Sequence, residues 1–159
     1  MASIFVGLGS NTRPQENIDK AITQIEEFCD SVEESPCYLS PAVGKASGEF
    51  ANMVIAAQTD LSPHALVARL KAIEYSCARS TSEQTIDLDL LLYDDLQMVS
   101  GDVRVPREDI ELYPFVLKPL SELAPDLIHP QLNKTLKEMW RESDFNDAQL
   151  KPVQRASLD

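Results

Sequence analysis

The hydrophobic positions of this chain follow two different spacings. Runs rich in β-branched and aliphatic residues predict four strands, at residues 4–8, 32–39, 50–58 and 85–93. Two polar segments carry an apolar residue every three or four positions and predict amphipathic helices, at residues 18–28 and 66–73. Pro36 interrupts the second strand, and Ser62 with Pro63 marks the start of the second helix, because serine caps helices and proline suits their first turn.

The order strand, helix, strand, strand, helix, strand predicts an α+β fold. We expect a ferredoxin-like sandwich with helices packed on one face of a mostly antiparallel sheet. Residues 96–99 are expected to turn back as a hairpin partner of the fourth strand, and short helices are expected near 116–123 and 132–140. Periodicity then ends, which predicts a single domain at residues 1–142 and a mobile tail at residues 143–159.

Charge changes what this domain is expected to bind. The 159 residues include 14 Lys and Arg against 26 Asp and Glu, which gives a formal net charge of −12. Such a surface repels phosphate backbones and anionic lipid headgroups, so we expect no nucleic-acid partner and no membrane partner. An anionic substrate would have to arrive with a cation.

The cysteines and the apolar runs bear on location. Cys29, Cys37 and Cys77 are odd in number and form no C-x-x-C pair, which favours buried thiols in a reducing compartment. No apolar run reaches the roughly 20 residues that cross a bilayer. The first residues lack the basic region of a signal peptide, and we expect a cytoplasmic protein.

Asp87 and Asp89 are the clearest candidates for chemistry. Side chains two positions apart on a strand project from the same face, about 6.6 to 6.8 Å apart along the chain. The alternating Ile86, Leu88 and Leu90 would face the core and fix the pair. Carboxylate oxygens suit Mg²⁺, which takes the rest of its shell from water and substrate phosphates. The alternative is a solvated strand face whose acids bind nothing.

Other local patterns favour ordinary structural roles. Gly7–Asn11 follows a strand but lacks the third glycine of a dinucleotide loop, so we interpret it as a tight turn before a helix. His64 and His129 have no cysteine or carboxylate at metal-ligand spacing, which argues against zinc. Singly, Phe50 and Phe115 would be ordinary core or turn residues, although two such rings can sandwich a flat heterocycle.

Seven short motifs together change this interpretation. They are Gly7–Asn11, Tyr38–Gly44, Phe50–Asn52, Ile73–Glu74, Thr85–Asp89, Val105–Pro106 and Phe115–Leu120. In order and spacing they resemble the 6-hydroxymethyl-7,8-dihydropterin pyrophosphokinase family over residues 2–130. The resemblance implies a ferredoxin-like fold and transfer of diphosphate from ATP to the pterin hydroxymethyl group, which leaves AMP, in folate biosynthesis. ATP and the pterin would be the small-molecule partners of a monomer.

The resemblance also implies residue roles. Asp87 and Asp89 would hold two Mg²⁺ ions that bridge ATP to the pterin hydroxyl. Phe50 and Phe115 would stack on the two faces of the pterin. Hydrogen bonds to the edge of the ring would come from Ser40, Asn52 and the backbone at Val43. Nucleotide and phosphate contacts would come from Glu74 and Arg79. Apart from the resemblance, we expect Lys118 to bind the nucleotide as well.

The nucleotide half departs from the family pattern. The segment before Thr85 is shorter than the family's arginine-rich loop, and Gln84 replaces its last arginine. Arg107 and Glu108 replace a His-Tyr pair, and Tyr113 replaces another arginine. We expect Arg79 and Arg107 to be catalytic cations, with Arg107 as a displaced positive charge. Lys118, Lys45 and Arg104 are the other cations that could reach the phosphates.

Two alternatives remain open at this point. The first is a catalytically weakened relative that binds a pterin as a sensor or partner module. The second is an enzyme of the same fold that uses another heterocycle or phosphate donor. The replaced arginines favour the first alternative, because the loss of one donor to transition-state charge commonly costs about 10² to 10³ in rate.

Overall fold

The computed structural model describes residues 1–41, 48–78 and 86–158. The strands are β1 (Ala2–Ser10), β2 (Asp30–Glu34), β3 (Cys37–Pro41), β4 (Glu49–Thr59), β5 (Asp87–Tyr93), β6 (Met98–Ser100), β7 (Val103–Val105) and β8 (Lys151–Val153). The helices are α1 (Pro14–Ile25), α2 (Pro63–Ala78), α3 (Asp109–Leu112), α4 (Pro114–Leu123) and α5 (Leu136–Glu142), with 3₁₀ turns at Asp147–Gln149 and Arg155–Ser157.

The main sheet has the strand order β5-β1-β4-β3-β8, and β2 pairs with the second half of β4. Every pair is antiparallel. β2 and β3 act as one strand broken at Ser35 and Pro36, where the Ser35 amide donates to Val54 O (2.9 Å) and Ser35 Oγ accepts from Val54 N (2.8 Å). Counted as one strand, they give the βαββαβ order of a ferredoxin-like fold, and this prediction is confirmed.

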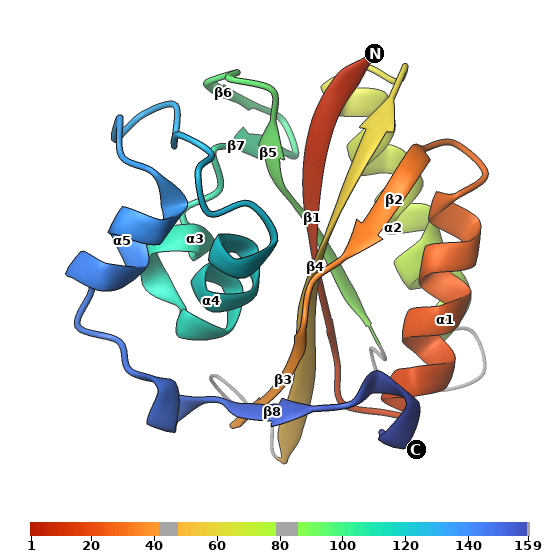
Figure 1. Cartoon of the computed structure of the whole chain (residues 1–159). Coiled ribbons are helices and arrows are strands. Elements are labelled where there is room, and N and C mark those ends of the chain that lie inside the picture. The colour runs from red at the N-terminus through yellow and green to blue at the C-terminus, as the bar shows by residue number, and fades with distance from the viewer. Residues whose placement is uncertain (42–47, 79–85, 159) are drawn as a thin grey trace.

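Helices cover both faces of the sheet, not one (Figure 1). On the first face, alternate residues Ile4, Val6 and Leu8 of β1 pack with the apolar sides of α1 and α2. On the second face, Val54 and Leu91 pack against residues of α3, α4 and α5. The sequence predicted helices near α4 and α5 but did not place them on the second face, because such short helices show little periodicity.

Two connections differ from the sequence prediction. β6 pairs with β7. The sequence had predicted that residues 96–99 would instead form a hairpin with the strand before them. The segment predicted to be a mobile tail, residues 143–159, contains β8, which pairs with β3. Three residues are too few to show the alternation by which a strand is recognised.

The three cysteines agree with the expectation of buried thiols. Cys29, Cys37 and Cys77 are free and buried. Among the described residues, no helix combines the length and the apolar character needed to span a bilayer.

Candidate functional site

Two glycines of β1 pair across the sheet with the two aspartates of β5. In the antiparallel register, Gly7 lies opposite Asp89 and Gly9 lies opposite Asp87. The alternating Val6 and Leu8 are buried on the other face, so the glycines and the aspartates share the α4 side of the sheet. Both glycines lie inside β1, and the tight turn predicted at residues 7–11 was therefore wrong in its position.

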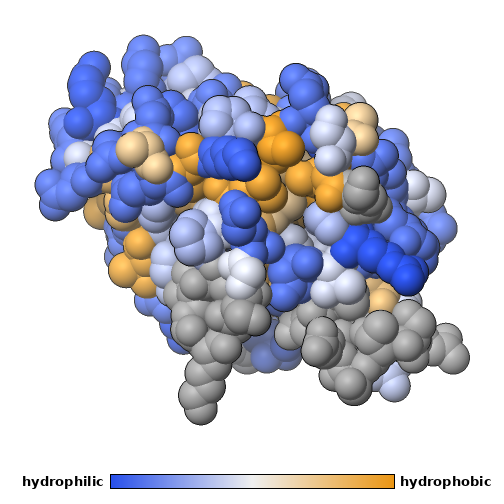
Figure 2. Space-filling view, turned by 90° about the horizontal axis from the view of Figure 1, so that it is seen from below, coloured by the Kyte–Doolittle hydropathy of each residue, from blue (hydrophilic) through white to orange (hydrophobic). Residues whose placement is uncertain are grey.

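A cavity lies on this face, between the ends of the central strands and α4. Its lining includes Gly7, Gly9, Ser40, Phe50, Asn52, Asp87, Asp89, Asp109 and Phe115. We call it the α4 cavity; it encloses about 680 Å³, including its open mouth. Seen from below, this end of the molecule shows apolar residues at the centre and hydrophilic residues around them (Figure 2).

The polar wall of the α4 cavity is held by hydrogen bonds. Ser40 and Asn52 are almost fully buried, on the neighbouring strands β3 and β4. Asn52 Nδ2 donates to Ser40 Oγ (2.7 Å) and to Phe50 O (3.2 Å). A Cβ on Gly9 would lie 3.1 Å from Asn52 Oδ1, so the amide oxygen lies over the glycine. This wall offers a fixed amide to the edge of a planar ligand.

The aromatic wall comes from Phe50 on β4 and Phe115 on α4. The Phe115 ring stacks on Tyr113, with centroids 5.0 Å apart and planes 16° apart. Such a stack limits the rotation of the Phe115 side chain. The two predicted ring-binding residues therefore line one cavity from two different elements, a strand and a helix.

A second cavity lies beside the outer edge of β5, which is the edge strand of the sheet. Its walls include Val67, Leu70 and Glu74 of α2, with Arg104 and Arg107. We call it the α2 cavity. Asp87 and Asp89 line both cavities, because an edge strand can be approached from two sides. Two ligands, one in each cavity, would therefore meet at the carboxylates.

Burial disfavours the ionised form of two carboxyl groups at this junction, those of Asp89 and Glu74. Burial raises the pKa of Asp89 above its usual range; Arg107 acts in the opposite direction, and Asp109 and Asp87 add to the rise. Burial also raises the pKa of Glu74 to about 7, against a hydrogen bond from Leu88 N (3.0 Å) and with smaller rises from Asp87 and Asp89. A bound cation would favour the ionised carboxylates and so oppose this effect of burial.

The two carboxylates suit Mg²⁺ better than they suit a metal ion that is coordinated by protein side chains alone. Among residues 1–41, 48–78 and 86–158, no cluster of three or more His, Cys, Asp or Glu side chains is arranged to hold a metal. Asp87 and Asp89 would therefore supply only part of the coordination shell. Mg²⁺ keeps several waters and takes further oxygens from phosphates, so two carboxylates at an open junction suit it.

Arg107 lies at the same junction. Its Nη2 lies 3.6 Å from Asp89 Oδ1, and its Nε lies 3.3 Å from Asp109 Oδ2. Asp109 opens α3 and lines the α4 cavity, and sequence reasoning did not find it. The only available signal was an acid two positions after Arg107, and the turn that aims both side chains inward is not visible in the sequence.

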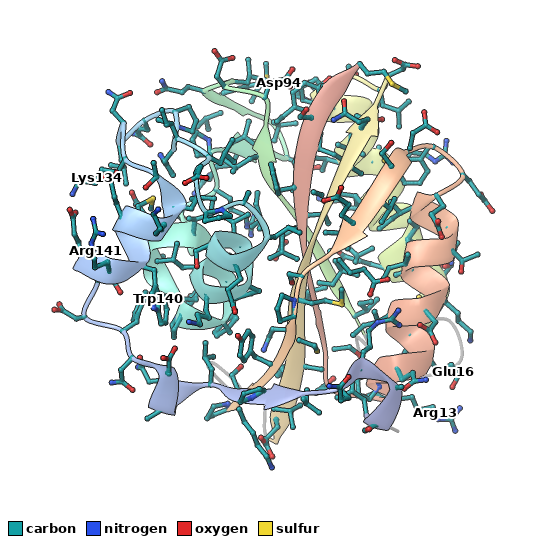
Figure 3. All side chains as sticks on the ribbon, in the orientation of Figure 1. Arg13, Glu16, Asp94, Lys134, Trp140 and Arg141 are labelled. Atoms are coloured by element: carbon teal, nitrogen blue, oxygen red, sulfur yellow. The ribbon has the colours of Figure 1, made fainter. Side chains whose placement is uncertain are left out.

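The structure describes two of the other predicted cations, Lys118 and Arg104. Lys118 Nζ pairs with Asp147 Oδ1 (3.0 Å) and lies 4.9 Å from the centroid of Trp140 on α5, labelled in Figure 3. Lys118 lines neither cavity. Arg104 lines the α2 cavity and pairs with Glu108 (3.0 Å). The predicted residues Val43, Lys45, Arg79 and Gln84 lie outside the described residues.

Comparisons with known proteins agree on one family. Residues 5–125 match the family 7,8-dihydro-6-hydroxymethylpterin-pyrophosphokinase (HPPK). The 2-amino-4-hydroxy-6-hydroxymethyldihydropteridine pyrophosphokinase of Aquifex aeolicus is 36% identical over 149 residues, which cover 90% of this chain and 93% of the relative. The Folic acid synthesis protein FOL1 of Dictyostelium discoideum is 31% identical over 142 residues, 86% of this chain and 22% of its own length.

The fold matches solved structures as well. The wild-type HPPK-DHPS of Plasmodium falciparum superposes with a TM-score of 0.73 at 13% identity, over 89% of this chain and 44% of that chain. This chain therefore spans less than half the length of that protein, and the low identity makes the likeness one of fold.

Proposed function

Because the chain belongs to the 7,8-dihydro-6-hydroxymethylpterin-pyrophosphokinase family and is a pyrophosphokinase of folate synthesis, we propose that it transfers diphosphate from Mg²⁺-bound ATP to 6-hydroxymethyl-7,8-dihydropterin. The pterin hydroxyl oxygen bonds to the β-phosphorus, the bond between that phosphorus and the α,β-bridging oxygen breaks, and AMP leaves. The hydroxyl proton is released. The observation that carries the proposal is that Asp87 and Asp89 line both cavities.

The α4 cavity is the proposed pterin site. Phe50 and Phe115 would hold the two faces of the ring, and Asn52 with Ser40 would pair with its edge. Because Asn52 is buried and already bonded to Ser40, its amide is oriented before the ligand arrives. Val43, which falls outside the described residues, stays a proposed contact on the strength of the family resemblance alone.

The α2 cavity is the proposed nucleotide site. Asp87 and Asp89 would hold two Mg²⁺ ions at its junction with the pterin site, and Glu74 would line its other wall. When bound, Mg²⁺ supplies charge neutralisation of the polyphosphate and alignment of the reacting oxygens. Arg107 is the described cation nearest the pair, and we assign it to the transferred phosphates, with Arg79 as a further proposed contact. For Lys118, the pairing with Asp147 supports an anchoring role instead.

The acidic surface is consistent with a nucleotide that binds together with Mg²⁺. With a formal net charge of −12, the protein would bind a polyanionic nucleotide only when cations offset its charge. We also propose that the protein is cytoplasmic, which the three free, buried thiols support, and that it is a monomer.

The test is formation of AMP from ATP and the dihydropterin, measured with Mg²⁺ and with excess chelator. Asp87→Asn and Asp89→Asn keep side-chain size but lose charge, and each should lower the rate by about 10² or more. Asp126→Asn is the matched control, because Asp126 is exposed and lines neither cavity. Its rate should equal that of the unmodified protein.

Pterin affinity measured in parallel separates this function from the binding module. The proposal fails if the unmodified protein binds the dihydropterin tightly and yet forms no more AMP than Asp87→Asn. It also fails if both aspartate variants keep full activity, because the junction between the cavities would then have no part in the reaction.

A further inference from the structure

The side-chain geometry of Arg107 sets it apart from a simple phosphate ligand. Its backbone is fixed, because Arg107 N donates to Leu91 O of β5 at 2.9 Å. From there the side chain reaches back along the same strand to Asp89. Arg107 lines the α2 cavity and Asp109 lines the α4 cavity, so their ion pair crosses the boundary between the two. The guanidinium therefore lies beside the carboxylates to which we assign the metal ions.

The guanidinium is held loosely in this position. Charge-assisted hydrogen bonds between arginine and carboxylate usually measure about 2.7 to 2.9 Å. Here the contacts to Asp89 and Asp109 measure 3.6 and 3.3 Å. Arg107 Nε is buried and donates no hydrogen bond to any described residue. The guanidinium is thus attracted by charge, but its Nε–H has no hydrogen-bond acceptor among the described residues.

We infer that Arg107 is a displaceable internal counter-ion, which pairs with Asp89 and Asp109 in the metal-free protein and moves to the polyphosphate when the metal-bound nucleotide enters. The inference rests on the proposed function and deepens it. In the absence of nucleotide, no phosphate offsets the repulsion between the guanidinium and an arriving metal ion, so the two compete for Asp89. A phosphate would supply the acceptor oxygens that Arg107 Nε lacks, and the metal would replace the guanidinium as the counter-charge of Asp89.

Metal binding in the absence of nucleotide is the direct test. Mn²⁺ prefers the same oxygen ligands as Mg²⁺, and its free form can be counted by electron paramagnetic resonance. Arg107→Met should bind Mn²⁺ about tenfold more tightly than the unmodified protein, because the competing charge is gone. Arg104→Met is the matched control: it removes the same charge from the same cavity, but Arg104 pairs with Glu108 and not with Asp89. Its Mn²⁺ affinity should change less than twofold.

Equal Mn²⁺ affinity in Arg107→Met and the unmodified protein would overturn the inference. An equal gain in Arg104→Met would overturn it too, since the effect would then be one of general charge. Neither result depends on turnover. If Arg107→Met binds Mn²⁺ more tightly but the unmodified protein forms no AMP, the proposed function is wrong and this inference stands.

A second measurement uses the unmodified protein and does not require a folded variant. The Arg107 Nε–H signal in a ¹H–¹⁵N spectrum should shift when Mg²⁺ and a non-hydrolysable ATP analogue are added together. It should shift much less with the analogue and chelator. An Arg107 signal that stays in place under both conditions means that the side chain does not move, and the inference is then wrong.

Discussion

Gly9 shows how one missing side chain shapes the site. Its position on β1 faces Asn52 across the β1–β4 pair and Asp87 across the β1–β5 pair. A methyl group there would lie 3.1 Å from Asn52 Oδ1, closer than an ordinary contact, whereas a methyl group at Gly7 would meet only the Leu91 side chain at 3.5 Å. The glycine pattern that resembles a phosphate loop is thus explained by close packing within the sheet.

Gly9→Ala should separate stability from ligand binding. Alanine suits a strand at least as well as glycine, so the melting temperature should not fall by more than a few degrees. The displaced Asn52 amide should lose one hydrogen bond to the ring, which weakens dihydropterin binding about tenfold in a fluorescence titration. Gly7→Ala is the control and should weaken binding less than threefold. Unchanged affinity in Gly9→Ala would mean that the Asn52 amide does not read the ligand.

Sequence reasoning found the residues whose position follows from strand alternation. Asp87 and Asp89 share a face because they are two apart, and Leu88 and Leu90 are buried behind them as expected. The contact between Arg107 and Asp109 could not be found in this way. It depends on how the chain returns to β5 and turns into α3, and neither is encoded in a periodic pattern.

At the scale of elements, the C-terminal segment is tied to the fold at three places. β8 pairs with β3, Asp147 pairs with Lys118 of α4, and Arg155 pairs with Asp19 of α1 and Glu34 of β2. The sequence predicted none of these contacts, because each joins residues distant in the chain through a short or irregular element. β8 lies beside β3, the strand that carries Ser40, and so supports one wall of the proposed pterin site.

Arg155→Ala should therefore destabilise the protein. The Arg155 side chain is 27% exposed and contacts two carboxylates, with its Nε 2.9 Å from Glu34 Oε1. We expect a loss of about 1 kcal/mol in the free energy of unfolding by urea, with a smaller loss at high salt. Lys137→Ala, which breaks an exposed pair with Asp126, should have no measurable effect. Equal stabilities for the two variants would show that the tail contributes little.

For the whole molecule, stability should depend on pH through His129. The ring is buried, and its Nδ1 accepts hydrogen bonds from Gln131 N and Leu132 N, both at 3.2 Å. Burial lowers the pKa of His129, with a smaller opposing effect of Glu111. The neutral ring is therefore favoured in the folded state. Below the pKa of the unfolded histidine, about 6.5, the unfolded chain binds a proton that the folded chain resists.

Above about pH 6.5, the contribution of His129 to the free energy of unfolding should be complete. As the pH falls from there towards the lower pKa of the folded state, this contribution should be lost, by up to about 1.4 kcal/mol per pH unit. Urea unfolding at several pH values, compared with His129→Gln, measures it as the difference between the two curves. His64→Gln replaces an exposed histidine and should keep the dependence of the unmodified protein. Parallel curves for the unmodified protein and His129→Gln would contradict the expectation.

The pairing of β8 with β3 also bears on how copies of the protein treat one another. Without those three residues, β3 would present a row of free amide and carbonyl groups, which is a template for strand addition by a second chain. The outermost strand is instead very short, carries the exposed Lys151, and includes Pro152, which has no amide hydrogen to offer. By covering the edge of β3, the C-terminal segment opposes edge-to-edge aggregation of this protein at high concentration.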